Sequence, residues 1–514
     1  MPKKHQVDWN KVDEFLAGLD TKETHEIEVR REAVPLVFVP GIMGTHLRRP
    51  GTNGEGEADG FPNLRWSTST WWVMSNLAFA RSDGAYRRRL IVGKPHQSFN
   101  PDYLEVDEDS PPGDGWRGIM EAYHIFLNKL REHDWKELDK YFVFPVYAVG
   151  YNWSDDVKSA GTHLAKRIDN IIEESRKITG LCEKVIVITH SMGGLVARTA
   201  SELCGANKKI AGIVHGVQPV NGSPGAYWRM KAGFEGFEAL GLVQRALGND
   251  GPKVTAIMGN IPGGLTLLPN KLYKANDGKA EWVRVTDGGN LIVAKPQADA
   301  NGLVDPYEQI YRRKAVVQSK AGEKPSTNEY WGAVDPALLN PEKTTPDGGD
   351  PFDEMNAELN NSWTIYVKNL GIAEALHDQL SPPLGLPLRH DQTLAGSGIQ
   401  HKTADVVEMK VESNWVRSNP YPNQGFRGFF VNAAGERMQA VIQDPAGDGD
   451  GTVPTSSGVG VDAPNRPSPG DIKLRMDHQP AYENELMQEW AIKAITAMVK
   501  HRYWEQRKGA DGPP

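Results

Sequence analysis

The chain has very little cysteine. Cys182 and Cys204 are the two cysteines among its 514 residues, and two thiols do not make the disulfide framework on which many small secreted proteins depend. This usage suits a reducing compartment. Because free cysteine behaves as a small buried apolar residue, we expect both side chains to serve packing rather than chemistry.

Long apolar runs are absent as well. No stretch approaches the roughly 18 consecutive apolar residues of a membrane-spanning helix. The opening residues, "MPKKHQVDWNKVDEF", include two lysines but lack the apolar segment that follows such lysines in a secretory signal. We therefore expect a chain made in the cytoplasm with no signal peptide or transmembrane segment, whose export would need a signal-independent route.

An excess of positive charge is also missing. The sequence has 58 lysines and arginines against 66 aspartates and glutamates, a formal net charge of -8. It offers no basic field to hold nucleic acid, which we exclude as a partner. Hydrophobic residues at 39% and charged residues at 24% are typical of a globular protein. The length predicts one large α/β core with a substantial insertion, or two to three domains.

What is present in the first half is an alternation of short apolar runs with amphipathic patterns. The run "VPLVFVPG" at 34–41 is typical of a strand buried on both faces. Ser154 or Asp155 can cap a helix that Gly180 ends. This spacing predicts a mostly parallel sheet with helices on both faces. The expected strands lie at 141–153, 185–188 and 209–224, and another helix at 118–133.

The alternation stops between 225 and 424, a stretch rich in Gly, Pro, Asn and Asp that is too long for a loop. We expect a cap or lid inserted into the core there, with a helix at 353–380. A final helix at 480–504 shows an apolar stripe of Leu486, Trp490, Ala494, Ile495 and Met498. The predicted division is an N-terminal extension (1–33), core (34–224), insertion (225–424), core (425–506) and disordered tail (507–514).

The segment "KVIVITHSMGGLVAR", 184–198, sets an apolar strand directly before Ser191 and a helical pattern directly after it. This nearly fits Gly-x-Ser-x-Gly, the nucleophile elbow in which a sharp strand-to-helix turn exposes a serine above a sheet. Position 189 is Thr rather than Gly. A serine hydroxyl is a poor nucleophile without a general base, and the base needs an orienting carboxylate.

An acid for this serine is expected downstream, since an α/β-hydrolase orders its residues Ser, Asp or Glu, then His. The turn "DPAGDGDGTVP", 444–454, offers Asp444, Asp448 and Asp450 among glycines that allow close backbone approach. We choose Asp450, directly before Gly-Thr-Val-Pro, with Asp448 as the alternative. The turn could otherwise be an acidic surface loop or a calcium loop, although no Glu stands at the closing position of an EF-hand.

The base is expected just after a later strand. "IKLRMDHQPAYENELMQEWAIKAI", 472–495, has a strand-like run that ends at His478, before a helix. The other candidates fall elsewhere: His377, His390 and His401 in the predicted insertion, and His501 late in the last helix. The oxyanion hole needs two backbone N–H donors. Met192, after the serine, supplies one, and Ile42 in "PGIMGT" is the natural second.

Several short segments together resemble one branch of the α/β-hydrolases, that of lecithin:cholesterol acyltransferase and lysosomal phospholipase, with the related inositol-deacylase-like lipases. They are "VFVPGIMGTHL", "YNW" at 151–153, "HSMGGLVAR", "LTLLPN" at 265–270, and "GDGTVP" followed by "DHQPAY". The resemblance implies an α/β-hydrolase fold, nucleophile Ser191, acid Asp450, base His478 and oxyanion donors Ile42 and Met192. It covers most of the core as islands and little of the insertion.

The chain departs from that family at three points. Family members usually have Tyr-Asp-Trp-Arg where this sequence has "YNWS" at 151–154, the secreted members carry disulfides, and the elbow carries Thr189. The build is also similar to phospholipase effectors that type VI secretion delivers into rival bacteria. That similarity implies an antibacterial role, with a secretion-apparatus or immunity protein as partner.

The substrate is expected to be lipid. The stretch 65–80 concentrates interfacial side chains that could form a lid or a peripheral membrane contact, although core packing of a helix explains them equally well. They are Trp66, Trp71, Trp72, Met74 and Phe79. We predict a serine hydrolase, without a cofactor or metal, that cleaves carboxylic esters of lipids through an acyl-enzyme. The alternatives are an esterase for small soluble esters, an acyltransferase, and an inactive hydrolase-fold scaffold.

Overall fold

The computed structural model describes most of the chain. The described residues are 2–20, 22–49, 65–66, 83–92, 104–107, 116, 118–234, 248–315, 329–341, 351–382, 388–413, 421, 425–458 and 469–507.

A six-stranded sheet forms the centre of the molecule, and every pairing in it is parallel. Its order is β20-β14-β11-β10-β4-β9. All residues of β4, β10 and β11 are buried, as expected for parallel strands covered on both faces. The strands are β4 (Leu36–Val39), β9 (Val146–Ala148), β10 (Val185–His190), β11 (Ile210–Gly216), β14 (Thr393–Ile399) and β20 (Ile472–Arg475).

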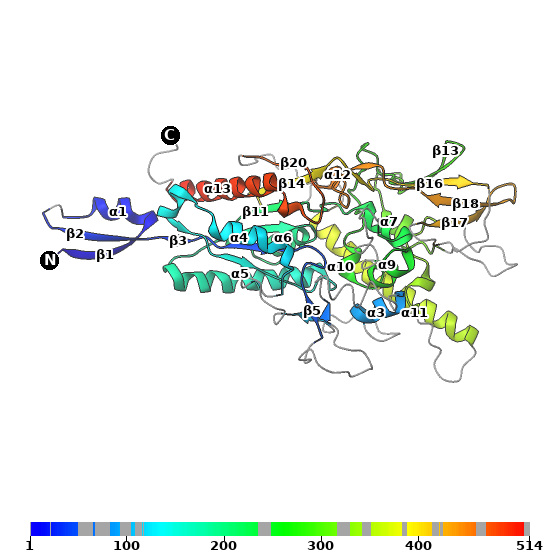
Figure 1. Cartoon of the computed structure of the whole chain (residues 1–514), viewed down its shortest axis with the longest axis horizontal. Helices are drawn as coiled ribbons and strands as arrows, with labels where there is room; N and C mark the ends of the chain where they lie inside the picture. The colour runs from blue at the N-terminus through cyan, green and yellow to red at the C-terminus, as the bar shows by residue number, and fades with distance from the viewer. Residues whose placement is uncertain are drawn as a thin grey trace.

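Helices cover both faces of this sheet (Figure 1). Val185 and Val187 of β10 pack in one apolar cluster with α5 (Val157–Thr179) and α6 (Gly193–Glu202). Ile186 and Ile188 pack in the other cluster with α4 (His124–Glu132) and α13 (Glu485–Arg507). Because successive side chains of a strand point to opposite faces, the run that the sequence shows as continuously apolar feeds two separate cores. The predicted three-layer α/β arrangement is confirmed.

Two local expectations differ from the structure. The N-cap of α5 is Asp156, whose carboxylate accepts from the N–H groups of Lys158 and Ser159, and not Ser154 or Asp155. Gly180 ends α5 in the left-handed region at φ 81°, as expected. In α13 the stripe is buried from Trp490 onward, but Leu486 is 59% exposed, and Met487 packs inward instead.

The predicted boundaries of the insertion are wrong at its C-terminal end. Strand β14, at 393–399, falls inside the predicted insertion but pairs between β11 and β20 of the central sheet. Strands β17 (Arg427–Val431) and β18 (Arg437–Ile442), placed in the core by the sequence, belong to a second sheet of order β13-β12-β16-β18-β17. The chain therefore leaves the central sheet after β11, returns for β14, and leaves again until β20. We call the residues between these core strands the insertion.

The insertion carries its own helices and the second sheet. The helices are α7 (Pro224–Ala232), α9 (Gly251–Met258), α10 (Pro262–Leu265), a π-helix at Tyr307–Tyr311, η8 (Pro336–Leu338), α11 (Pro351–Leu380) and α12 (Thr455–Gly458). The other strands of the second sheet are β12 (Val283–Asp287), β13 (Asn290–Lys295) and β16 (Val407–Glu412). Figure 1 shows these elements gathered at the end of the central sheet opposite the N-terminus.

The N-terminal extension has structure of its own. Strands β1 (Lys3–Asp8) and β2 (His25–Arg30) pair in parallel, joined by η1 (Trp9–Lys11) and α1 (Val12–Ala17), and they project from one end of the molecule (Figure 1). The remaining short elements are β3 (Glu32–Ala33), β5 (Leu47–Arg48), β6 (Arg65–Trp66), α3 (Gly84–Val92), β7 (Glu105–Val106), η4 (Glu121–Tyr123), η5 (Lys136–Lys140), β8 (Phe142–Val143), η6 (Asn207–Lys209), β15 (His401–Thr403), β19 (Gly447–Gly449) and η9 (Ala481–Glu483). Within the described ranges, no helix combines the length and apolar character needed to cross a bilayer.

Candidate active site

Ser191 occupies the turn between β10 and α6, where the sequence predicts it. Its φ of 53° lies in the left-handed region, which is uncommon for a residue with a side chain and is expected of a strained elbow. The residues after it must be small. A Cβ at Gly193 would lie 2.4 Å from the carbonyl oxygens of Val39 and Pro40, and one at Gly194 would lie 2.5 Å from Gln218 Cγ. The glycines therefore let α6 begin directly against β4.

Thr189 fits the elbow through a hydrogen bond that the sequence alone does not reveal. It pairs with His215 across β10 and β11, and its Oγ1 lies 2.9 Å from His215 Nδ1. Both side chains are fully buried, and burial lowers the pKa of His215 to about 3. The threonine hydroxyl thus has a partner in an interior where an unpaired polar group is costly.

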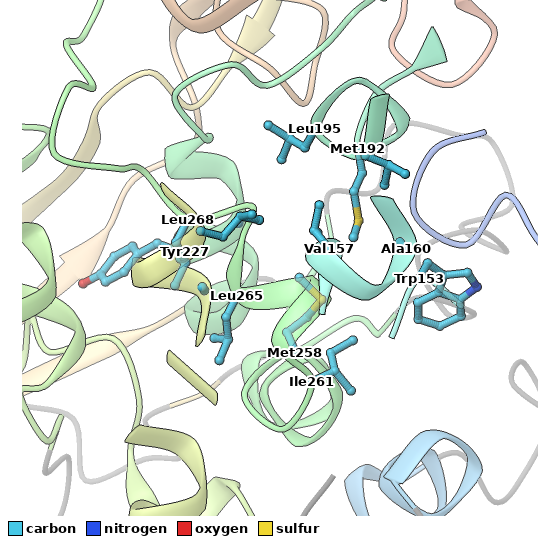
Figure 2. Packing of buried hydrophobic residues seen from close by; sticks show 14 of the residues in the cluster. Trp153, Val157, Ala160, Met192, Leu195, Tyr227, Met258, Ile261, Leu265 and Leu268 are labelled. Atoms are coloured by element: carbon cyan, nitrogen blue, oxygen red, sulfur yellow. The ribbon is translucent and has the colours of Figure 1, made fainter. Parts of the chain in front are cut away.

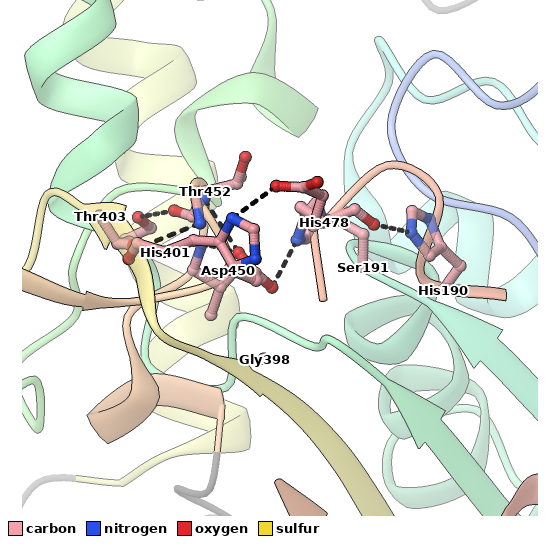
Figure 3. Close-up of polar contacts among 12 residues, drawn as sticks. His190, Ser191, Gly398, His401, Thr403, Asp450, Thr452 and His478 are labelled. Carbon is pink, nitrogen blue, oxygen red and sulfur yellow. Dashed lines mark hydrogen bonds and ion pairs between the residues drawn. The ribbon is translucent and has the colours of Figure 1, made fainter. Parts of the chain in front are cut away.

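Asp450 is the carboxylate of the acidic turn that faces the histidine (Figure 3). Its Oδ1 accepts from the backbone N–H groups of Thr452, at 2.9 Å, and Val453, at 2.6 Å, while Oδ2 lies 2.8 Å from His478 Nδ1. Asp450 is 2% exposed. Asp448, the alternative, is exposed and accepts instead from Gln400 N and Thr455 Oγ1.

The position of the acidic turn depends on the strand that the sequence missed. Strand β19 of the turn pairs with β15, which directly follows β14. A Cβ at Gly398, in β14, would lie 2.3 Å from Asp450 Cβ, so the glycine makes room for the acid above the end of this strand. His478 comes just after the neighbouring strand β20. Acid and base therefore meet at one edge of the sheet.

His478 joins the acid to the serine. Its Nε2 lies 2.8 Å from Ser191 Oγ, and its Nδ1 faces Asp450. A carboxylate can only accept, so Nδ1 carries the proton and Nε2 is free to accept from the serine hydroxyl. This is the tautomer that a general base needs. His478 is 4% exposed and Ser191 5%, so the three side chains form a buried series.

The loop after β4 adjoins the serine. A Cβ at Gly41 would lie 3.0 Å from Ser191 Cβ, and Met43 has a φ of 61°, so this loop turns tightly over the elbow. Among the hydrogen bonds of the described residues, none is donated by the N–H of Ile42 or of Met192. Both donors named from the sequence are therefore unengaged beside the serine, although their role in an oxyanion hole stays a prediction.

Residues of the insertion hold the acidic turn in place, and the sequence gave no signal for them. Arg229 Nη2, from α7, donates to the carbonyl of Gly451 at 3.0 Å and to Thr452 Oγ1 at 3.1 Å. Ser223 Oγ donates to the carbonyl of Thr452 at 2.6 Å. The start of the insertion is thereby tied to the residues that orient Asp450.

An apolar cluster lies next to the elbow. Figure 2 shows Met192 directed toward Val157 of α5 and Met258 of α9. An ideal Cβ at Gly263 would lie 3.2 Å from Met192 Cε, so the segment that includes α10 packs closely on this side chain. The surroundings of the serine on this side are therefore hydrocarbon.

The lid candidates are mostly outside the described residues. Trp66 ends β6, whose backbone pairs with Leu47 of β5. Trp71, Trp72, Met74 and Phe79 lie outside the described ranges, as does the predicted tail from 508 onward. Their proposed contact with lipid stays a prediction.

Comparisons with known proteins agree with this architecture. A family model described as a PGAP1-like α/β domain matches residues 132–234, which include β10, Ser191 and α6. No curated protein sequence matches the chain. Among solved structures, a chain in the crystal structure of the Tle4–Tli4 complex is 21% identical, with a TM-score of 0.60, over 92% of this chain and 99% of that one. Aspergillus fumigatus lipase B aligns with 14% identity over 67% of this chain and 63% of that one, at a TM-score of 0.20 that is too low to support inference.

The expected fold is thereby confirmed. The chain has an α/β-hydrolase fold, with a parallel sheet flanked by helices and a large insertion. At 21% identity the solved neighbour speaks for the fold alone, so any activity has to be argued from the site.

Proposed function

We propose that this α/β-hydrolase-fold protein is a serine hydrolase that cleaves carboxylic esters of lipids through an acyl-enzyme. The observation that carries the proposal is the hydrogen-bonded series from Ser191 through His478 to Asp450, with 2.8 Å at each step. A nucleophile, a base and an orienting carboxylate within hydrogen-bond reach are the requirements of this chemistry.

The reaction begins at the serine. His478 Nε2 takes the hydroxyl proton as Ser191 Oγ bonds to the ester carbonyl carbon, and the carbonyl electron pair moves to oxygen. The N–H groups of Ile42 and Met192 stabilise that oxyanion. The ester C–O bond then breaks, and the imidazolium gives its proton to the departing alcohol oxygen. Water, deprotonated by His478, releases the acid and restores Ser191. Asp450 stabilises the imidazolium throughout.

A lipid substrate is favoured over a small soluble ester by the closure of the site. The serine, base and acid are each 5% exposed or less, and Met192 packs into hydrocarbon. A substrate must therefore displace cover, and an apolar acyl chain replaces the lost apolar contacts at about 25 cal/mol per Å² removed from water. A small polar ester has little such surface.

A panel of lipids tests the proposal. Purified protein is incubated with phosphatidylcholine, phosphatidylethanolamine, phosphatidylglycerol and triacylglycerol in vesicles or emulsions, and released fatty acid is measured. We expect turnover of at least one lipid and a loss on the order of 10⁶-fold in Ser191→Ala, as when the serine of a well-studied protease is removed. Ser201→Ala, on α6 and hydrogen-bonded to Glu202, is the matched control.

Each alternative predicts a different outcome. Hydrolysis of p-nitrophenyl butyrate with no lipid turnover indicates a small-ester esterase. Ester products that accumulate only with an added alcohol indicate an acyltransferase. A folded protein with no activity in any arm indicates a scaffold.

The stretch 65–80 supplies a second test of the lipid assignment. Polar substitutions at Trp71 and Trp72 are expected to weaken vesicle binding and to spare hydrolysis of p-nitrophenyl butyrate. Equal losses on both substrates would assign these tryptophans to core packing.

A protein partner and an antibacterial role form a further part of the proposal. The neighbouring solved structure is of a complex, Tle4–Tli4, and we propose that this chain likewise binds a dedicated partner protein that blocks it. Directing the chain to the periplasm of a bacterium is expected to arrest growth, whereas Ser191→Ala is not. Growth that continues with active enzyme present contradicts the antibacterial role.

A further inference from the structure

We propose that Tyr123 and His190 form a hydrogen-bonded relay that positions His478, and that both are positioning residues for the reaction. The inference rests on the proposed function above. His190 directly precedes Ser191, but its side chain points to the opposite face of the sheet from Thr189, because strand residues alternate.

The relay spans three loops that are far apart in the sequence. His190 Nε2 lies 2.9 Å from the backbone carbonyl oxygen of His478, a contact drawn in Figure 3. On the other side of the ring, Nδ1 lies 2.9 Å from the hydroxyl of Tyr123. That hydroxyl accepts in turn from the N–H of Gly41, at 3.4 Å.

The direction of each hydrogen bond follows from its ends. A backbone carbonyl can only accept, so His190 Nε2 carries the proton. Burial lowers the pKa of His190 to about 3, so near neutral pH the ring has a single proton and Nδ1 accepts. Tyr123 must then donate to Nδ1, which leaves its oxygen lone pairs for Gly41 N–H. All donors and acceptors match, so the relay has one consistent arrangement.

The relay completes the support of the base. The four polar groups of His478 are all engaged: its N–H donates to the Asp450 carbonyl at 2.9 Å, its carbonyl accepts from His190, and its two ring nitrogens face Asp450 and Ser191. Without the relay its carbonyl loses its contact with the elbow. The residue would then be held to the acidic turn and no longer to the strand that carries the serine.

The other end of the relay reaches the oxyanion loop. Gly41 directly precedes Ile42, and a Cβ at Gly41 would lie 2.8 Å from His190 Nδ1, so the ring packs against the backbone there. Tyr123 is held by the core: its ring lies 4.9 Å from that of Phe38, and it is buried. A rigid aromatic core thus sets the spacing of the proposed oxyanion donor, the nucleophile and the base.

The chain contains a matched control for this relay. Tyr482 is a second buried tyrosine in the same apolar cluster, and its hydroxyl donates to the backbone carbonyl of Thr189, in the same strand, at 3.0 Å. Tyr482→Phe therefore removes one buried hydroxyl beside β10 without touching His478. A purely structural role for Tyr123 predicts that the two tyrosine variants behave alike.

The experiment compares Tyr123→Phe, His190→Leu, His190→Gln and Tyr482→Phe with the native protein. kcat and KM are measured with p-nitrophenyl butyrate, and the rate of covalent labelling is measured with a fluorophosphonate. Thermal melting establishes that each variant is folded. His190→Gln is the rescue variant, because its amide retains one donor for the His478 carbonyl and one acceptor for Tyr123.

The expected result is a fall in kcat and in labelling rate of about 10- to 100-fold for Tyr123→Phe, the scale of a small misplacement of reacting groups. KM should stay within about twofold, His190→Leu should lose more, and His190→Gln should recover at least tenfold over His190→Leu. Tyr482→Phe should stay within about threefold of the native protein.

Two results overturn the relay. Tyr123→Phe may not match the native protein in kcat and labelling rate, and Tyr482→Phe may not lose as much as Tyr123→Phe; either finding assigns Tyr123 to packing alone. A native protein that is folded but neither turns over the ester nor reacts with the probe overturns the proposed function, and the relay with it. The native sample therefore separates the two failures.

Discussion

Substituting Asp450 by asparagine tests the proposed site more sharply than removing it. Asparagine has nearly the same shape, but one of its oxygens becomes an NH₂ group that can only donate. The two backbone N–H groups of Thr452 and Val453 point at Oδ1, and a donor cannot face them. The amide oxygen is therefore held at Oδ1, and the NH₂ group is directed at His478 Nδ1.

This orientation imposes the wrong tautomer on the base. With an N–H opposite it, Nδ1 must accept, so the single ring proton moves to Nε2, the atom that lies 2.8 Å from Ser191 Oγ. A protonated Nε2 cannot take the serine proton. The equivalent change in a chymotrypsin-type protease lowers kcat about 10⁴-fold, which corresponds to about 5.4 kcal/mol of barrier, and we expect a loss of this size here.

Asp448→Asn is the control, two residues away in the same turn. Its carboxylate accepts from Gln400 N and Thr455 Oγ1 and does not face His478, so we expect a change in kcat within about threefold. Both variants are assayed for kcat/KM with p-nitrophenyl butyrate, with circular dichroism to establish folding. A loss below tenfold in Asp450→Asn, or a greater loss in Asp448→Asn, would refute the assignment of the acid.

Two further predictions concern stability. Burial lowers the pKa of His190 and His215 to about 3 and that of His377 to about 4, against about 6.5 in the unfolded chain. Between pH 6.5 and these values the unfolded chain binds more protons, so the free energy of unfolding should fall as pH falls, by up to about 1.4 kcal/mol per pH unit for each histidine. Urea denaturation at pH 7, 6 and 5 measures this, and a free energy that is level or higher at pH 5 contradicts it. Gly193→Ala should destabilise the fold by about 1–3 kcal/mol because its Cβ would meet two backbone carbonyls, whereas Gly371→Ala, in α11 with nothing within 4 Å, should stabilise it by about 0.4–1 kcal/mol. Thermal melts that rank the two variants in the opposite order would show that the packing around Gly193 has been misjudged.

The elbow and the parallel sheet could be predicted because each depends on residues close together in the sequence. The apolar run before Ser191 and the glycines after it are local requirements of the turn. The partner of Thr189 could not be predicted, because His215 lies in the next strand and the register between strands decides the pairing. The same holds for Tyr123, which the sequence marks only as part of an apolar helix face.

The choice between Asp450 and Asp448 could be narrowed to one turn but not decided by residue type. Pairing of β19 with β15 decides it, since it leaves Asp448 exposed and Asp450 buried beside His478. The error at Leu486 has a similar origin. Residues three and four positions before Trp490 both lie near its face of the helix, and Met487 is selected by its approach to Gly396 of β14.

The boundary of the insertion was mispredicted because β14 is an unusual core strand. Its sequence, "TLAGSGI", has two glycines and a serine, residues that weaken a strand signal. These small residues are what the packing requires, since Met487 and Asp450 approach Gly396 and Gly398 too closely for a side chain. Conversely, β17 and β18 have strong strand patterns that do not reveal which sheet they join.

The most direct test of the central claim is to locate the adduct of a fluorophosphonate by mass spectrometry of the folded protein. The account predicts a single phosphonylated residue, Ser191, with no labelling of Ser191→Ala and greatly slowed labelling of His478→Ala. An adduct on another residue, or a folded native protein that does not react, would contradict the proposal that Ser191 is an activated nucleophile.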